Sequence, residues 1–266
     1  MPADMHELTA DLAAETADVR KLIAGLDEAG WRTPTPAIGW TIAEQVSHLA
    51  YFDDAAVISA TDAERFAAEL MSDVEKGLTA DDVAERFKGL NGQELLSWFD
   101  RSRQRLLEVF AALDPTARVP WFGPPMSAAS SVTARIMETW AHGQDIADAL
   151  GAGREVSPRL RHVAHIGVRA LPFSFLANGL EVPAEPIRVE LTWENDEVWT
   201  WGPPDATNRV TGQALDFCLL VVQRRHRDDT AIEATGAAAA RWLDVAQAFA
   251  GPPGPGRRPG QHDQAD

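Results

Sequence analysis

Cysteine is almost absent from this sequence of 266 residues: Cys218 is the single one, so an intramolecular disulfide is excluded. Cys218 stands in the apolar run 215–222, which predicts a small buried residue rather than a nucleophile. Basic residues are also scarce. The 24 lysines and arginines stand against 40 acidic residues, and the resulting net charge of −16 disfavours nucleic acid as a partner.

Long apolar runs are missing too. No segment approaches the roughly 20 apolar residues that a membrane-spanning helix needs, so no membrane association is expected. Residues 1–7 are polar and acidic, unlike a secretory signal, and we therefore expect a cytoplasmic protein. What is present is typical of a globular chain: 45% hydrophobic and 24% charged residues, in a length that suits one or two domains.

Helical periodicity dominates the first part of the chain. Apolar stripes mark four long segments that begin near Ala3, Thr41, Asn91 and Ser131, and two shorter helices are expected within 61–89. Thr41 is followed three residues later by a glutamate, which predicts a capping box, and Asn91 has the same spacing. Most of the arginines at positions 101, 103 and 105 are expected in solvent. These helices and connections predict a four-helix bundle.

The pattern changes after Gly151. Ser157 and Pro158 predict a helix start, and alternation over 187–193 with a return segment over 198–201 predicts two paired strands. A helix over 213–225, a strand over 230–235 and a helix over 237–249 follow. The expected fold class is mostly α, with these parts: a four-helix bundle over 1–152, a smaller C-terminal α+β domain over 153–250, and a disordered Gly/Pro-rich tail over 251–266.

A carboxylate and an imidazole stand four residues apart at Glu138 and His142, which puts both on one helix face with Cβ atoms about 5–6 Å apart. Asp145 shares that face. If the helix beginning at Thr41 packs alongside, His48 completes an N,N,O ligand set for one divalent metal, with coordination positions left open. An ordinary ion pair facing water has the same spacing, and a lone histidine beside an apolar stripe is often a core-edge residue. The triplet of a zincin protease, two histidines flanking a glutamate on one helix, is missing.

The motifs of the first part resemble those of the DinB-like superfamily, and specifically the metal-binding domain of the mycothiol-dependent maleylpyruvate isomerase family. They are Gly39-Trp40-Thr41 leading to His48, and Glu138 followed by His142 and Asp145. The resemblance covers about residues 5–150. It implies a divalent metal, usually zinc, bound by His48, Glu138 and His142. It also implies a possible homodimer.

The second part is similar to the C-terminal domain of the same family, in which an arginine near a helix end helps to hold an acidic substrate. Arg224 and Arg225 both match that position. They would bind a substrate carboxylate, although basic side chains at a helix C-terminus are also favourable without any ligand. Asp145 would orient His142 from behind, although a solvated acid fits there equally.

The resemblance implies a metal-dependent thiol transferase or isomerase. A bound divalent metal would activate a low-molecular-weight thiol, with mycothiol as the possible cosubstrate, for attack on a small electrophile. The alternative is a non-catalytic metal-binding protein whose C-terminal domain binds a small apolar ligand. Trp193, Trp199 and Trp201 would then line the pocket, although tryptophans alternating in a short sheet usually form core. His162 and His165, three residues apart, are expected to be structural.

Overall fold

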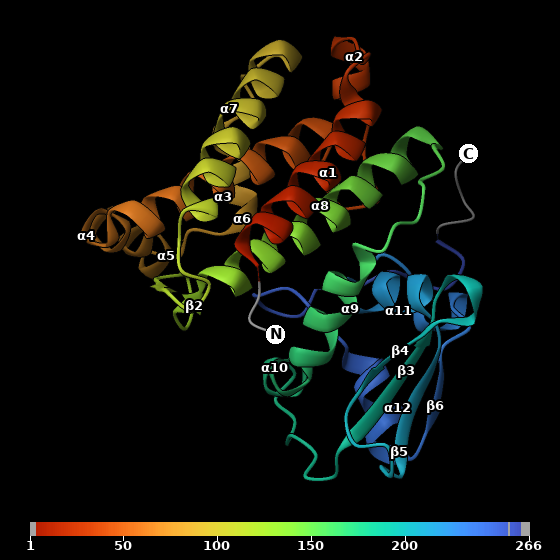
Figure 1. The fold of residues 1–266 in the computed structure, drawn as a ribbon. Helices are drawn as coiled ribbons and strands as arrows, with labels where there is room; N and C mark the ends of the chain where they lie inside the picture. Colours follow the sequence, from red (N-terminus) through yellow and green to blue (C-terminus); the bar gives the residue numbers. More distant parts are fainter. Residues whose placement is uncertain (1–3, 255, 262–266) are drawn as a thin grey trace. The chain divides into compact units, whose positions relative to one another are not determined.

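The computed structural model describes residues 4–254 and 256–261, and the chain divides into two units, Met1–Arg154 and Glu155–Asp266. The first unit is helical, and the second combines helices with a four-stranded sheet (Figure 1). This is the mostly α fold with a smaller α+β part that the sequence predicts. Residues 255 and 262–266 of the expected disordered tail lie outside the described residues.

Four long helices build the first unit: α1 (Met5–Ile23), α3 (Ile42–Thr61), α7 (Gly92–Ala111) and α8 (Ala128–Leu150). Helix α3 lies against α7 and α8, and α1 lies against the same two helices, which closes a four-helix bundle (Figure 1). The shorter elements are α2 (Glu28–Trp31), α4 (Ala63–Arg65), the π-helix η1 (Phe66–Met71), α5 (Ser72–Glu75), α6 (Ala80–Arg86), β1 (Arg118–Val119) and β2 (Met126–Ser127).

Side chains at the helix ends explain where the helices begin. Asn91 caps α7: its side chain accepts a hydrogen bond from the Glu94 backbone N–H at 3.0 Å, and its own N–H donates to the Glu94 carboxylate at 2.8 Å. The apolar stripe of the first segment predicts one helix over 3–28, but the first helix ends at Ile23. Asp27 accepts a hydrogen bond from the N–H of Gly30 at 2.8 Å and caps the separate helix α2, so the chain bends before it.

The connection over 61–89 is also more broken than expected. The first of the two short helices predicted here covers 61–76, and in its place the chain forms α4, the π-helix η1 and α5. Phe66 and Leu70 of η1 are buried and pack with Ala55 of α3, so contacts with α3 accompany this irregular turn. Helix α6 follows after the Thr79 capping box.

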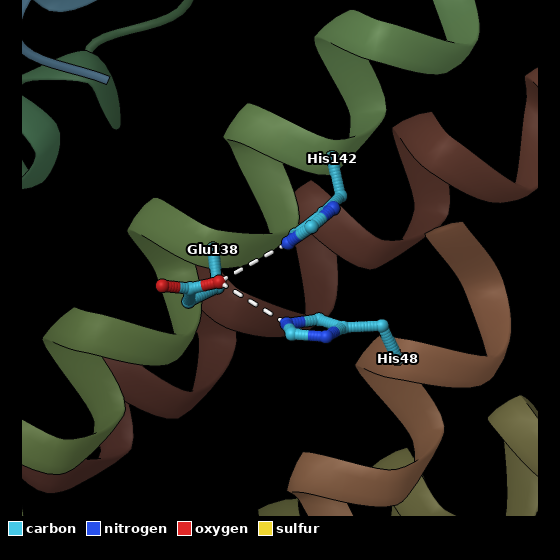
Figure 2. Close-up of side chains that lie close together, drawn as sticks. All are labelled: His48, Glu138 and His142. Atoms are coloured by element: carbon cyan, nitrogen blue, oxygen red, sulfur yellow. Dashed lines mark hydrogen bonds and ion pairs between the residues drawn. The ribbon is translucent and has the colours of Figure 1, made fainter. Parts of the chain in front are cut away.

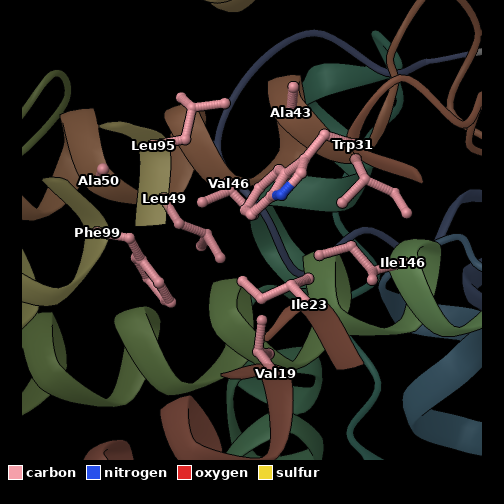
Figure 3. Packing of buried hydrophobic residues seen from close by; sticks show 11 residues of the cluster. Val19, Ile23, Trp31, Ala43, Val46, Leu49, Ala50, Leu95, Phe99 and Ile146 are labelled. Atoms are coloured by element: carbon pink, nitrogen blue, oxygen red, sulfur yellow. The ribbon is translucent and has the colours of Figure 1, made fainter. Parts of the chain in front are cut away.

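An apolar cluster fills the bundle at the end where α2 lies (Figure 3). Its fully buried members from α3 include the large side chains of Ile42, Val46 and Leu49, and each of these contributes about 1.5–3 kcal/mol by leaving water. Phe99 of α7 and Ile146 of α8 pack against the same cluster. This face of α3 points into the bundle. Side chains at the edge of the same face therefore point toward α8.

The second unit contains α9 (Leu160–Arg169), α10 (Leu171–Ala177), β3 (Ile187–Thr192), the 3-10 helix η2 (Glu194–Asp196), β4 (Val198–Trp201), β5 (Asn208–Gln213), α11 (Ala214–Val221), the 3-10 helix η3 (Arg227–Asp229), β6 (Glu233–Thr235) and α12 (Ala237–Val245). The sheet order is β4-β3-β5-β6. Strand β3 pairs antiparallel with β4, as its alternation predicts, and parallel with β5. Among the described residues, no helix combines the length and apolar character that crossing a membrane requires.

Three expected helix limits in this unit are wrong. Helix α9 begins at Leu160, because the Leu160 N–H bonds the Ser157 carbonyl at 3.0 Å and Ser157-Pro158 belongs to the preceding turn. Helix α11 ends at Val221, and Gln223 takes a left-handed φ of 58° that no α-helix continues through. The last helix, α12, stops at Val245. Cys218 of α11 is buried, as expected, and burial raises the pKa of its thiol.

Candidate metal centre

The start of α3 fixes where His48 points. The Thr41 backbone N–H donates to the Glu44 carboxylate at 2.8 Å, which completes the capping box predicted from the sequence. Counted from this start, His48 comes at the edge of the stripe that contains Val46 and Leu49. Its side chain is 12% exposed and faces α8 (Figure 2).

Helix α8 supplies the other two side chains. Glu138 and His142 stand one turn apart, and the His142 Nε2 lies 3.2 Å from the Glu138 Oε2. The His48 Nε2 lies 3.6 Å from the same carboxylate oxygen. Figure 2 shows each ring directing a nitrogen toward the same oxygen of the Glu138 carboxylate. One ligand atom from each residue falls within 4.8 Å of the others, so the structure brings the three sequence-predicted metal ligands together.

These distances suit a small divalent cation. A tetrahedral zinc ion with ligand distances of about 2.0–2.1 Å separates its ligand atoms by roughly 3.3 Å. The separations of 3.2 and 3.6 Å between Glu138 Oε2 and the two imidazole nitrogens lie on either side of that value. Two imidazole nitrogens with one carboxylate oxygen are also the donor types that zinc accepts, and three protein ligands leave a position open.

The charges within the cluster favour a cation as well. Burial alone would raise the pKa of the Glu138 carboxyl, but the two histidines outweigh it and hold that pKa well below its usual range. Burial, reinforced by His142, lowers the pKa of His48 to about 4. At neutral pH the cluster therefore offers a carboxylate and a neutral His48 ring. The buried Nδ1 of His48 has no hydrogen-bond partner among the described residues.

Aromatic rings surround the two histidines. Trp40 stacks on His142 with ring centroids 5.9 Å apart and lies 5.3 Å from the His48 ring. Phe52, one turn after His48, lies 4.6 Å from it. The Trp40 indole N–H donates to the Asp81 carboxylate of α6 at 2.7 Å, which holds the ring in place. These rings keep water away from the imidazoles and strengthen local electrostatic interactions.

Gln45 is the functional candidate that sequence reasoning missed. Its side-chain oxygen contacts Nδ1 of His142, and the residue is fully buried. The sequence prediction gave the orienting role to Asp145, which is also fully buried, whereas the structure gives the Nδ1 contact to Gln45. Its position in the sequence could have identified Gln45 as a candidate. It stands three residues before His48 and therefore lies on nearly the same face of α3.

The remaining candidates lie in the second unit. Arg224 and Arg225 follow the end of α11 instead of standing in its last turn as expected, and both backbone N–H groups bond the Leu219 carbonyl. Trp199 is buried and stacks on Trp193 with centroids 4.7 Å apart, which is core packing. The Trp201 indole N–H donates to Nδ1 of His165 at 3.2 Å.

A four-helix bundle that gathers two histidines and a glutamate from facing helices defines a DinB-like protein. The chain belongs to the family described as the mycothiol maleylpyruvate isomerase N-terminal domain, which matches residues 12–147. Residues 183–235, from β3 to β6, match a second family, described as wyosine base formation.

Relatives extend the comparison to the full chain. Two uncharacterized proteins from strains of Mycobacterium tuberculosis, MT0041 and Rv0036c, are each 49% identical over 257 residues, covering 96% of this chain and 100% of theirs. Two crystal structures of the mycothiol-dependent maleylpyruvate isomerase, one of them a mutant, match with TM-scores of 0.57. Their identities are 16% and 17%, over 87% of this chain and 93% of theirs, so this likeness establishes the fold.

Proposed function

We propose that this chain is a divalent-metal-dependent enzyme of the maleylpyruvate isomerase or thiol S-transferase type. His48, Glu138 and His142 would hold the ion, and a low-molecular-weight thiol would attack a small electrophile beside it. Family membership favours mycothiol as the thiol. The set of two imidazoles and one carboxylate favours zinc as the metal. The observation that carries the proposal is the convergence of three ligand atoms from two helices within 4.8 Å.

The chemistry follows from the ligand set. A divalent ion with an open position stabilises a bound thiolate, so that a thiol is a strong nucleophile at neutral pH. Glu138 supplies one negative charge and His48 a neutral lone pair, which leaves the complex with net positive charge to attract that thiolate. Trp40 and Phe52 lie against the imidazoles and would limit the access of water, which competes with the thiolate for the open position.

The reaction then takes one of two courses. In a transfer, the thiolate sulfur forms a bond to the electrophilic carbon, and the leaving group departs with the electron pair. In an isomerisation, the sulfur adds to an activated double bond, rotation follows, and the sulfur leaves again, so the thiol is returned unchanged. The roles of Arg224 or Arg225 as carboxylate ligands, and of Asp145 in orienting His142, stay predictions. Arg224→Ala and Arg225→Ala should each be tested for an increased KM with an acidic substrate.

Metal analysis of the purified protein tests the proposal first. We expect about one zinc ion per chain, lost in His48→Ala and in Glu138→Gln. His6→Ala, which removes an exposed histidine of α1, is the matched control and should retain the metal. The metal-loaded protein is then assayed with mycothiol, using maleylpyruvate and 1-chloro-2,4-dinitrobenzene as electrophiles. Wild-type protein that binds no divalent metal, or a rate that does not depend on thiol, would overturn the proposal.

The same variants separate catalysis from a purely structural metal. If the ion only stabilised the bundle, His48→Ala would lower the thermal midpoint along with the metal content. We expect His48→Ala to lose the metal while its midpoint stays within a few degrees of metal-loaded wild type. A midpoint well below that of metal-loaded wild type, with His6→Ala unaffected, would contradict this expectation.

A further inference from the structure

A chain of hydrogen bonds leads away from the metal centre through His142. The Nδ1 of His142 contacts the side-chain oxygen of Gln45. The side-chain nitrogen of Gln45 donates to the Thr35 hydroxyl at 2.9 Å. The Thr35 hydroxyl in turn donates to the Trp40 carbonyl at 2.9 Å. Gln45 is fully buried, so both ends of its amide are matched inside the protein.

The direction of each bond follows from what each group can do. The Trp40 carbonyl only accepts, so the single hydroxyl hydrogen of Thr35 is committed to it, and the oxygen is left to accept from Gln45. The amide nitrogen of Gln45 therefore faces Thr35, and its oxygen faces His142. An oxygen acceptor requires a donor opposite, which places the ring proton of neutral His142 on Nδ1.

This tautomer has a consequence on the other side of the ring. With the proton on Nδ1, the Nε2 of neutral His142 presents a lone pair to the Glu138 carboxylate, 3.2 Å away. Two acceptors facing each other repel, and a cation between them removes the repulsion. The Gln45 amide thus selects the form of His142 that accepts a metal and disfavours the form that would simply hydrogen-bond Glu138.

The hydrogen bonds that start at His142 end in the loop from Thr35 to Trp40, which lies beside the two imidazoles. Thr35 and Trp40 close this loop, since the Thr35 N–H also donates to the Trp40 carbonyl at 2.8 Å. Trp40 then places its indole against both imidazoles. The loop that orients Gln45 is therefore the same loop that shields His142 from water.

We propose that Gln45, oriented by Thr35, is a positioning residue that holds His142 in its Nδ1-protonated tautomer so that Nε2 is available to the metal. This inference rests on the proposed metal-binding role for its purpose, but the tautomer itself is a property of the metal-free chain. Gln45 contacts no substrate in this account, and it acts through His142.

Nitrogen-15 NMR of histidine-labelled, metal-free, full-length protein tests the inference. When the His142 ring carries a single proton, the spectrum should show a protonated Nδ1 and an unprotonated Nε2. Gln45→Met removes the acceptor and should shift the ring toward the Nε2-protonated form. Thr35→Val should give a mixture, because the Gln45 amide loses the group that orients it. Gln45→Glu, unlike Gln45→Met, keeps an acceptor oxygen at this position and should keep the wild-type tautomer.

Zinc affinity, measured by competition with a chromophoric chelator, is the second readout. Gln45→Met should weaken binding tenfold to 100-fold, and Gln45→Glu should not. Gln144→Met is the matched control: Gln144 stands two residues from His142 but bonds Asp148 at 2.7 Å, and its loss should change neither readout. An Nε2-protonated His142 in wild-type protein, or an unchanged tautomer in folded Gln45→Met, would overturn the inference. If wild type binds no metal, the proposed function fails, while the tautomer still decides the role of Gln45.

Discussion

Replacing Asp53 with asparagine should remove much of the stability of the helical bundle. Asp53 is fully buried and accepts hydrogen bonds from two buried arginines: Arg103 Nε at 2.7 Å and Nη2 at 3.2 Å, and Arg135 Nε at 3.0 Å. Asparagine keeps the volume but removes the charge. Two guanidinium groups would then remain buried without a counterion in contact, and this is the costly state.

The magnitude follows from what the arginines retain. Removing one partner of a buried ion pair typically costs about 3–5 kcal/mol. Arg103 would still donate to Thr139 at 3.0 Å and Arg135 to the Leu49 carbonyl at 3.2 Å, so the cost should stay near that range despite the two arginines. Against a total folding stability of roughly 5–15 kcal/mol, this loss is large.

Urea denaturation of the full chain, followed by far-ultraviolet circular dichroism, measures the effect of Asp53→Asn. The control is Asp54→Asn on the same helix. Asp54 accepts one hydrogen bond from the Trp98 indole at 2.8 Å, and an asparagine oxygen can accept it equally, so the loss should be under about 1 kcal/mol. If the two variants lose the same small amount, buried charge pairing does not hold the bundle together and the reasoning is refuted.

Three further outcomes are expected. Cys218 should react with a thiol reagent at about pH 8 only after unfolding, because burial raises its pKa, and rapid labelling of native protein would contradict this. Gly92→Ala should lower the free energy of unfolding by about 1–3 kcal/mol, because the added Cβ would lie 2.2 Å from Nε1 of the buried Trp31. In Gly89→Ala, the control, the added Cβ contacts no other atom, and thermal melts should show no change. Metal-free protein should lose stability as the pH falls from 6.5 to about 4, since burial lowers the pKa of His48 and only the unfolded chain takes up that proton. This slope, from urea titrations across the range, should flatten in His48→Gln.

The parts of the structure that local chemistry determines were predictable from the sequence. The capping boxes that begin α3 and α7 each involve residues three apart, and both were recognised from Thr41 and Asn91. The alternation of β3 was likewise visible, because its period of two reports directly which face is buried. The pairing of Glu138 with His142 follows from the helical repeat alone.

The missed features depend on contacts between distant parts of the chain. Arg101 and Arg105 are exposed, as expected for most of the arginines at 101, 103 and 105. Arg103 is only 2% exposed, because Asp53, fifty residues earlier, neutralises it. Gln45 bonds His142 across 97 residues, and no spacing rule connects two helices in that way. The end of α1 before Asp27 is also not predictable from periodicity, because the apolar stripe continues past it. Asp27 is the N-cap of the separate helix α2.

The side chains of the bundle themselves hold α3 against α8 beside the metal position. Arg135 donates to the Leu49 carbonyl at 3.2 Å and to Asp53 at 3.0 Å, and Leu49 directly follows His48. Arg135 in turn stands one helical turn before Glu138. Because these bonds and the apolar cluster of Figure 3 already join the helices, the distance between His48 and Glu138 needs no ion to set it. An ion entering such preformed ligands adds reactivity more than architecture, and for this reason we prefer the catalytic proposal to a structural metal.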